Sequence, residues 1–213
     1  MITIFHIPQS RSMRVVWLME ELGEAYRIER VAFPTPADYR AVSPLGTVPA
    51  IVDDGVPGGV RMFESIAILQ YLTGVRLVAG NETAAALTVG PKPDQALYAE
   101  HLTMLHFGEA DLAAACTSIF RWQMAMRKEG GDDAIPEHRR ARLAGRLAFL
   151  DQRLADGREW ITGERFTIAD ISIGYALGFA SFLGLAGMFG PNLAAYWQRL
   201  QARPAFQRAA TAA

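Results

Sequence analysis

The residues best suited to bind a ligand lie in two short segments: Ser-Pro-Leu-Gly-Thr-Val-Pro-Ala-Ile over 43–51 and Phe-Glu-Ser-Ile-Ala-Ile over 63–68. Pro49 has no N–H for a sheet ladder and directly precedes an apolar run, so Val48–Pro49 is expected to be a fixed turn into a strand and a candidate for a cis peptide. Such a turn would leave the backbone N–H and C=O of Val48 free to pair with an extended peptide. Glu64 and Ser65 place a carboxylate, a hydroxyl and free N–H groups at a helix N-terminus. Each piece alone is typical of an ordinary turn or cap, but together they favour a peptide site.

The start of the first expected helix offers a second source of chemistry. Residues 8–14 lead into an apolar helical face, so Ser10 and Ser12 lie at or near a helix N-terminus. One of these serines is expected to be the helix cap. A hydroxyl in this place, helped by the helix dipole and the charges of Arg11 and Arg14, can donate a hydrogen bond to a bound thiolate.

The energy of this interaction is sufficient to activate a thiol. Lowering a thiol pKa of about 8.5 by roughly two units requires about 2.7 kcal/mol of preferential stabilisation of the thiolate. A charge-assisted hydrogen bond of about 1.5–3 kcal/mol and a dipole contribution of up to about 1 kcal/mol supply it. No general base is required, which agrees with the absence of a GxSxG motif from the sequence.

Composition narrows the function classes. The chain has 213 residues, is 51% hydrophobic, and balances 21 basic against 22 acidic residues, so it lacks the charge excess expected of a partner for nucleic acid or an anionic membrane. It shows neither a leader-like start nor about 18 uninterrupted apolar residues, and a cytoplasmic location is expected. Cys116 is the single cysteine, which excludes an internal disulfide, and the four histidines do not have the spacing of a metal site.

The chain is expected to divide near residue 80. Strand-like runs at 2–5, 26–31, 50–52 and 60–63 alternate with helical runs at 11–22, 38–42 and 65–71, which predicts a small β-α-β-α-β-β-α domain over residues 1–79. Residues 80–93 lack a clean period and end in Gly-Pro-Lys-Pro, which is typical of a linker. Residues 94–213 are expected to form an all-helical domain.

One helix start in this second half has a strong local signal. Thr167 and Asp170 stand three residues apart as a capping box, and Phe166 and Ile171 have the positions of a hydrophobic staple. The helix that follows carries almost no charge, so it is expected to be buried. We interpret Asp170 as a structural residue rather than a catalytic acid.

Over nearly its whole length, the chain resembles the cytosolic glutathione transferase family, and bacterial members in particular. Four pieces match that family in order: residues 10–15, 46–50, 64–65 and 166–170. The resemblance implies a thioredoxin-like N-terminal domain that binds glutathione as co-substrate and an all-helical C-terminal domain with the acceptor pocket. It also implies a homodimer.

The resemblance assigns roles by position. Ser10 matches the activating serine of the serine-type transferases. Val48 would pair its backbone with the cysteinyl part of glutathione, and Pro49 would be the family's cis-proline. Glu64 and Ser65 would hold the γ-glutamyl end.

The sequence departs from the family pattern beside this turn. Many relatives carry Lys or Gln before the Val-Pro pair, where it can meet the glycyl carboxylate, and here the residue is Thr47. Either the affinity for glutathione is then weaker, or another basic residue such as Arg11 or Arg40 substitutes. Some related proteins carry cysteine in place of Ser10, and its absence argues against stable mixed-disulfide chemistry.

The acceptor pocket is less defined by sequence. His106 falls on the first long helix of the second domain, where some bacterial relatives place a site histidine. Phe107 and Trp122 could line the pocket, or they could be core residues.

The resemblance implies transfer of the glutathione thiolate to a small apolar electrophile. One alternative is glutathione-dependent reduction of a disulfide or peroxide at the same site. Another is a binding protein of the same fold with no turnover.

Overall fold

The computed structural model describes residues 1–90 and 94–212, and these divide into two compact units. The first comprises Met1–Val89 together with Gln201–Ala213, and the second comprises Gly90–Leu200. An α/β unit and an all-helical unit were expected from the sequence, and this fold class is confirmed. The C-terminal segment Gln201–Ala213 groups with the first unit, whereas the sequence analysis placed it in the helical domain over 94–213.

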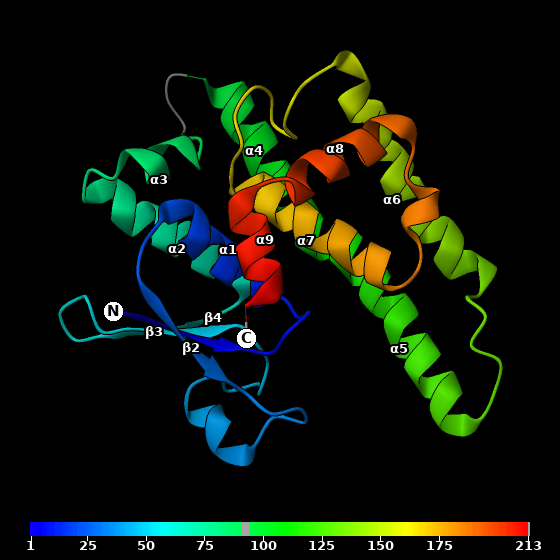
Figure 1. The fold of residues 1–213 in the computed structure, drawn as a ribbon, viewed down its shortest axis with the longest axis horizontal. Helices are drawn as coiled ribbons and strands as arrows, with labels where there is room; N and C mark the ends of the chain where they lie inside the picture. The colour runs from blue at the N-terminus through cyan, green and yellow to red at the C-terminus, as the bar shows by residue number, and fades with distance from the viewer. Residues whose placement is uncertain (91–93, 213) are drawn as a thin grey trace. The chain divides into compact units, whose positions relative to one another are not determined.

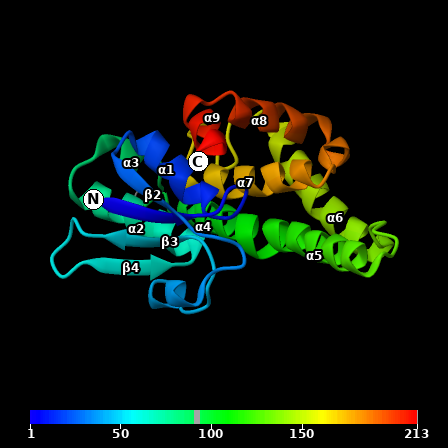
Figure 2. The same ribbon diagram turned by 60° about the horizontal axis from the view of Figure 1, so that its bottom comes forward.

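The first unit is built on a four-stranded mixed sheet (Figure 1). Its elements are β1 (Ile2–His6), α1 (Met13–Leu22), β2 (Tyr26–Arg30), the 3₁₀ helix η1 (Ala37–Ala41), β3 (Ala50–Asp53), β4 (Val60–Phe63), α2 (Ser65–Val78), α3 (Glu82–Ala86) and α9 (Pro204–Thr211). The strand order is β2-β1-β3-β4, in which β1 and β2 are parallel and the other pairs are antiparallel. The expected hairpin of β3 and β4 is seen clearly in Figure 2.

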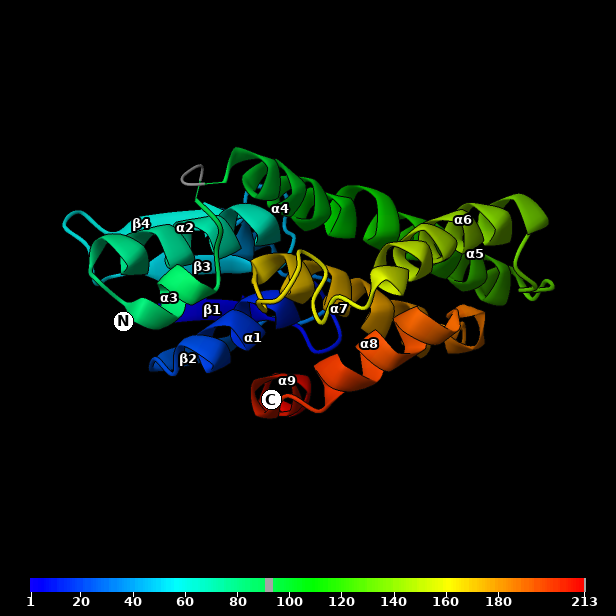
Figure 3. The same ribbon diagram turned by 90° about the horizontal axis from the view of Figure 1, so that it is seen from above.

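Helix α9 belongs to the first unit because it packs on α1 (Figure 3). The rings of Trp17 and Phe206 meet edge to face at 4.9 Å. Arg203 binds the carboxylate of Glu21 through two hydrogen bonds of 2.7 Å. The apolar face of α9 is therefore buried against a helix that precedes it by about 190 residues, and no local sequence pattern reports such a contact.

The expected linker over 80–93 is partly a helix. Asn81 caps α3 by accepting a hydrogen bond from the backbone N–H of Ala84 at 2.9 Å, and both Ala84 and Leu87 are buried. The sequence expectation was wrong here because a five-residue helix is too short to show a period. The Pro-Lys-Pro part of the expected linker, 91–93, lies outside the described residues.

The second unit contains helices α4 (Gln95–Phe107), α5 (Ala114–Glu129), α6 (Glu137–Arg153), α7 (Ile168–Phe182) and α8 (Pro191–Gln201). Between them lie the π-helical segment η2 (Gly108–Ala113) and the 3₁₀ helices η3 (Leu154–Asp156) and η4 (Ala186–Met188). Helices α4 and α5 continue into one another through η2 (Figure 2), and α6 returns beside α5 (Figure 3). In the part of the chain that the structure describes, every helix is too short or too polar to cross a membrane.

Helix α7 forms the core of the second unit and packs on α4, η2 and α5. Helix α7 can approach η2 closely because residue 108 is glycine: a Cβ atom at this position would lie only 2.3 Å from Ser172 Oγ. Ser172 in turn donates a hydrogen bond of 2.8 Å to the carbonyl of Leu105. The π-helical turn and the small residue together let α7 touch the backbone of its neighbour.

The capping box predicted at the start of α7 is confirmed. The carboxylate of Asp170 accepts hydrogen bonds of 2.8 Å from the backbone N–H of Thr167, the backbone N–H of Ile161 and the hydroxyl of Tyr196. Asp170 is fully buried. Burial raises the pKa of Asp170 to about 6, although these hydrogen bonds act in the opposite direction.

We predict that Asp170→Ala lowers the free energy of unfolding by about 3–5 kcal/mol, because it leaves buried donors unpaired at about 1–3 kcal/mol each. Asp170→Asn keeps one acceptor oxygen and should cost less. Because the folded pKa is raised from 3.8 to about 6, the aspartate contributes most below pH 4 and loses this contribution as the pH rises to 6. The stability of the wild type relative to Asp170→Asn should therefore fall over that range, as measured by urea unfolding. A constant difference would contradict the raised pKa.

Candidate ligand-binding site

Three chain segments meet at one end of the strands of the first unit, where β1 and β4 end and β3 begins. We call this end the ligand edge of the sheet. In the pairing of β1 with β3, Phe5 faces Ala50, and in the pairing of β3 with β4, Ala50 faces Phe63. Just beyond these partners the chain leaves β1, enters β3 and leaves β4. The segments at this edge carry the predicted site residues Ser10, Val48, Glu64 and Ser65. The sheet register thus brings together positions that are up to 55 residues apart in sequence.

The two serines after β1 are hydrogen-bonded to each other, with their Oγ atoms 2.7 Å apart. Ser10 Oγ donates to the carbonyl of Ile7 at 2.7 Å, and Ser12 Oγ lies 2.8 Å from Nδ1 of His6. Ser12 is fully buried, whereas Ser10 is half-buried. Ser12 occupies the N-cap position of α1, but its side chain makes no capping hydrogen bond and instead faces the interior. Ser10 is therefore the serine that a ligand can reach.

A buried hydrogen bond joins the starts of α1 and α2. The guanidinium of Arg14 donates to Ser65 Oγ at 3.1 Å, and both side chains are almost completely buried. Arg14 lies one helical turn beyond Ser10. This contact fixes the distance between the hydroxyl after β1 and the helix start after β4, and it places a buried positive charge beneath the site.

The turn before β3 is held by side chains that leave its outer backbone free. The Val48–Pro49 peptide is cis, as expected from the sequence. The Tyr39 hydroxyl donates to the carbonyl of Thr47 at 3.0 Å, and Ser43 Oγ accepts from the N–H of Thr47 at 3.2 Å. Burial raises the pKa of Tyr39 to about 12, so its hydroxyl remains a donor. Among the described residues, none hydrogen-bonds to the backbone of Val48.

The backbone has positive φ at two non-glycine residues of the described chain, and both lie at this edge. Gln9 has a φ of 60° directly before Ser10, and Glu64 has a φ of 77° directly before Ser65. Such conformations cost about 1–3 kcal/mol and concentrate at ligand sites. At Glu64 the carboxylate makes no helix-capping bond and remains exposed to solvent.

A basic side chain lies next to the exposed Thr47. Arg40 is on η1, and its guanidinium donates to the carbonyl of Pro44 at 3.1 Å. The guanidinium of Arg40 also lies close to Gly46 in the turn: if Gly46 carried a Cβ atom, that atom would be 3.7 Å from the guanidinium carbon. Gly46 itself has a φ of 65° and accepts a hydrogen bond from Thr35 Oγ1 at its carbonyl. Arg11, the other predicted basic substitute, is half-buried between the two serines.

The three residues suggested for an acceptor pocket have separate surroundings in the second unit. His106 is exposed on α4. The ring of Phe107 packs 5.3 Å from that of Phe149 on α6, and Trp122 donates its indole N–H to the carbonyl of Ala134 at 3.0 Å. Phe107 and Trp122 are separated by 15 positions, which places them about 20 Å apart along the continuous helical run, so the structure does not bring these two side chains together.

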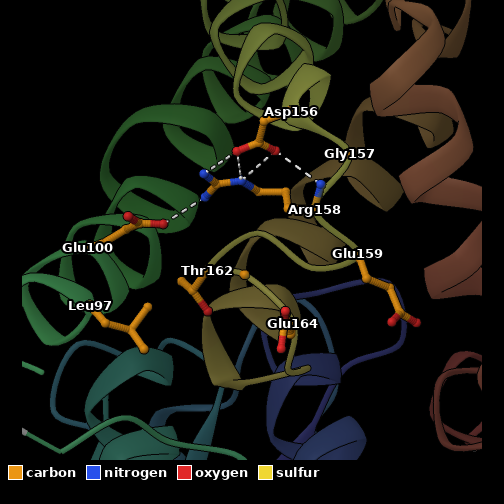
Figure 4. A pocket seen from close by; sticks show the side chains of 9 residues that line it. Leu97, Glu100, Asp156, Gly157, Arg158, Glu159, Thr162 and Glu164 are labelled. Carbon is orange, nitrogen blue, oxygen red and sulfur yellow. Dashed lines mark hydrogen bonds and ion pairs between the residues drawn. The ribbon is translucent and has the colours of Figure 1, made fainter. Parts of the chain in front are cut away.

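A pocket in the second unit contains none of the predicted site residues (Figure 4). It is lined by Leu97, Glu100, Asp156, Gly157, Arg158, Glu159, Thr162, Gly163 and Glu164. Arg158 pairs with Glu100 at 2.7 Å and with Asp156 at 2.6 Å, and Glu100 also contacts Arg153. The charged side chains at the centre of this pocket therefore neutralise one another. Across residues 1–90 and 94–212, no three His, Cys, Asp or Glu side chains gather as a metal site would require.

Sequence reasoning did not single out two residues that shape this edge. His6 ends an apolar strand, and its bond to Ser12 depends on how the chain turns after β1. Tyr39 lies in a short helix, and its bond to Thr47 depends on the turn before β3. In both cases the residue type was visible, but only the folded backbone shows the partner.

Two parts of the chain match models of known protein domains. Residues 10–74 match the model described as glutathione S-transferase, N-terminal domain, and residues 132–199 match that described as glutathione S-transferase, C-terminal domain. The chain is 32% identical to glutathione S-transferase 3 of Schizosaccharomyces pombe over 188 residues, which cover 80% of this chain and 70% of the relative. It is 31% identical to glutathione S-transferase GstA of Escherichia coli O157:H7, over 82% of this chain and 78% of that protein.

A solved structure extends the comparison to nearly the whole chain. A glutathione transferase family member from Pseudomonas fluorescens, crystallised with two glutathione molecules bound, superposes with a TM-score of 0.80 at 27% identity. The match covers 98% of this chain and 92% of that structure.

Proposed function

Because the chain belongs to the glutathione S-transferase family, we propose that it is a glutathione transferase that joins the thiolate of glutathione to small apolar electrophiles. The observation that supports this most is the register of β1, β3 and β4. It gathers a reachable hydroxyl, an unpaired strand backbone and a helix start with an exposed carboxylate at one edge. A tripeptide with an ammonium group, a thiol and two carboxylates needs groups of these kinds.

Each part of glutathione has a proposed partner. The backbone of Val48 pairs with the cysteinyl residue, as an added strand would. Glu64 receives the γ-glutamyl ammonium, and Ser65 with the N–H groups at the start of α2 receives the adjacent carboxylate. Arg40 is better placed than Arg11 for the glycyl carboxylate, because its guanidinium lies beside the turn that carries Thr47.

Ser10 is the proposed catalytic residue. Its hydroxyl donates to the glutathione sulfur and stabilises the thiolate, with support from the dipole of α1 and the buried charge of Arg14. The sulfur attacks an electrophilic carbon of the acceptor, a carbon–sulfur bond forms, and the displaced group or the electron pair of the acceptor's π bond takes up the charge. The thiol proton has by then left to solvent.

The acceptor is proposed to bind against the helical unit, where His106, Phe107 and Trp122 remain candidates for its pocket. Because Phe107 and Trp122 are far apart, a small acceptor would contact one of them. The role in detoxification and the cytoplasmic location are part of this proposal. They follow from the acceptor class and from the single cysteine of the sequence.

Two other functions use the same site. In glutathione-dependent reduction the sulfur attacks a disulfide or peroxide, and a second glutathione completes the reaction. The two glutathione molecules bound to the Pseudomonas fluorescens structure are an observation that suits this alternative. A binding protein without turnover would retain affinity for glutathione but show no shift of the thiol pKa.

We predict that Glu64→Ala weakens glutathione binding by about ten- to a hundredfold, the loss of one charge-assisted hydrogen bond. Isothermal titration calorimetry measures the change. Glu29→Ala, which removes an exposed carboxylate from β2, is the matched control and should bind as the wild type does. Undiminished affinity in the Glu64 variant would remove this residue from the site.

Ser10→Ala should raise the thiol pKa of bound glutathione by about one to two units, equivalent to about 1.4–2.7 kcal/mol, and slow turnover near neutral pH. Affinity for glutathione should change less. The thiolate absorbs in the ultraviolet, so titration of the complex reports the pKa directly, and Ser10→Thr, which keeps the hydroxyl, serves as the control. If the Ala variant titrates as the wild type does, backbone amides or an arginine must stabilise the thiolate instead.

The protein is also proposed to be a homodimer, on the basis of family membership. Sedimentation at micromolar concentration should give about twice the chain mass of 23.4 kDa. A single monomeric species at that concentration would disprove the proposal.

A further inference from the structure

The hydrogen-bond chain that ends at Ser10 begins at a buried histidine. His6 is the last residue of β1 and is 1% exposed. Its Nδ1 lies 2.8 Å from Ser12 Oγ, which lies 2.7 Å from Ser10 Oγ. The proposed function uses only Ser10, so the two buried members of this chain remain to be explained.

The three shortest contacts of the chain, at 2.7, 2.7 and 2.8 Å, each need a proton, and this requirement sets their direction. The carbonyl of Ile7 can only accept, so the 2.7 Å contact to it uses the proton of Ser10. The contact between the serines must then use the proton of Ser12. The contact between Ser12 and His6 must in turn use a proton on Nδ1 of the imidazole.

This arrangement also uses the one donor and both acceptor positions of the Ser12 hydroxyl, so the longer contact of 3.2 Å between Ser12 Oγ and the Ile7 carbonyl holds no proton. A serine hydroxyl donates once and accepts twice. Ser12 Oγ accepts from His6 Nδ1 and from the backbone N–H of Ile7 at 3.2 Å, and it donates to Ser10. With the opposite direction, Ser10 would donate to Ser12, and its 2.7 Å contact with the Ile7 carbonyl would hold no proton.

The surroundings of His6 keep a single proton on the ring. Burial and the positive charge of Arg30, its register partner on β2, lower the pKa of His6. An interaction with the backbone of Ala212 is the smallest of the three causes and raises this pKa. No atom of the described residues is in hydrogen-bond geometry with Nε2, so Ser12 Oγ at Nδ1 is the short polar contact of the ring.

We propose that His6, as its Nδ1–H tautomer, is a positioning residue that acts through Ser12 to make Ser10 a hydrogen-bond donor toward the bound thiolate. The inference rests on the proposed function of this site. The lone pairs of Ser10 are occupied by the O–H of Ser12 and by its N–H at 3.3 Å. When glutathione binds, the Ser10 proton rotates from the Ile7 carbonyl to the sulfur, and Ser12 continues to donate behind it.

The tautomer of His6 thus decides how readily Ser10 donates to the sulfur. If Nε2 carried the proton, Ser12 would donate to His6 and Ser10 would donate to Ser12. Ser10 could then turn its proton to the thiolate only by giving up its hydrogen bond to Ser12, with no donor behind it. Hydrogen bonds in series also polarise one another, so Ser10 becomes a stronger donor than an isolated serine.

The tautomer can be tested without any ligand. Long-range ¹⁵N–¹H correlation spectra of the full chain labelled with ¹⁵N-histidine distinguish the protonated from the bare ring nitrogen, and His6→Asn identifies the His6 signals by their loss. We expect the protonated nitrogen of His6 to be Nδ1. A proton on Nε2 alone would overturn the proposal, whatever the function of the site.

The catalytic consequence is tested by the thiol titration of bound glutathione. His6→Phe removes the donor and should raise the thiol pKa by about half a unit to one unit, and Ser12→Ala should do the same. His6→Asn, which can place an amide N–H where Nδ1 stood, should restore most of the shift. The double variant His6→Phe, Ser10→Ala should titrate as Ser10→Ala alone, because His6 acts only through Ser10.

A purely structural role of His6 gives different results. S-Methylglutathione has no ionisable thiol, so its affinity reports the integrity of the binding site and should be unchanged in His6→Phe. An unshifted titration in His6→Phe, or a shift that adds to that of Ser10→Ala, would refute the relay. If the wild type binds neither glutathione nor S-methylglutathione, the proposed function fails while the tautomer test still decides the relay. If His6→Phe does not fold, His6→Asn and Ser12→Ala carry the comparison.

Discussion

β3 is hydrogen-bonded on both sides to antiparallel strands, and this double pairing determines where every residue of the ligand edge lies. A slip of one residue in either ladder would turn the buried side chains of β3 to the opposite face of the sheet. Ala50 and Ile51 point to opposite faces of the sheet and both are fully buried, so packing on both faces holds β3 in its register. The geometry of the site is therefore a consequence of packing on the two faces of the sheet, and the loops only carry the chain to it.

The polar clusters around Asp170 and around Ser12 are both buried, so their polar atoms must be paired, but they have different roles. Around Asp170, four donors converge on one carboxylate, and the result is a fixed helix start within the core. Around Ser12, donors and acceptors form a row, and the last hydroxyl of that row reaches a surface that a ligand can approach. Every donor around Asp170 is held in place, whereas the hydrogen bonds around Ser12 end at the half-buried Ser10, whose hydroxyl can exchange one partner for a ligand.

Local signals in the sequence predicted most of this arrangement. The capping box at Thr167, the cis turn at Val48 and the two-part fold all depend on residues close together in the chain, where spacing and residue type carry the information. Helix α3 was missed because its capping residue, Asn81, precedes a segment too short to be periodic. The role of His6 was missed because its bond to Ser12 exists only after the chain turns at Gln9. Contacts across a turn or between distant segments have no local pattern.

The packing of α9 on α1 has a consequence for biosynthesis. Arg203 is synthesised 182 positions after its partner Glu21, and Phe206 follows Trp17 at a similar interval. The first unit therefore cannot bury this face of α1 until the helical unit between the two segments has been synthesised, although domains often fold in order as they emerge. During that interval the nascent chain presents an uncovered apolar helix face, the kind of surface that chaperones bind. Completion of the first unit thus follows synthesis of the second.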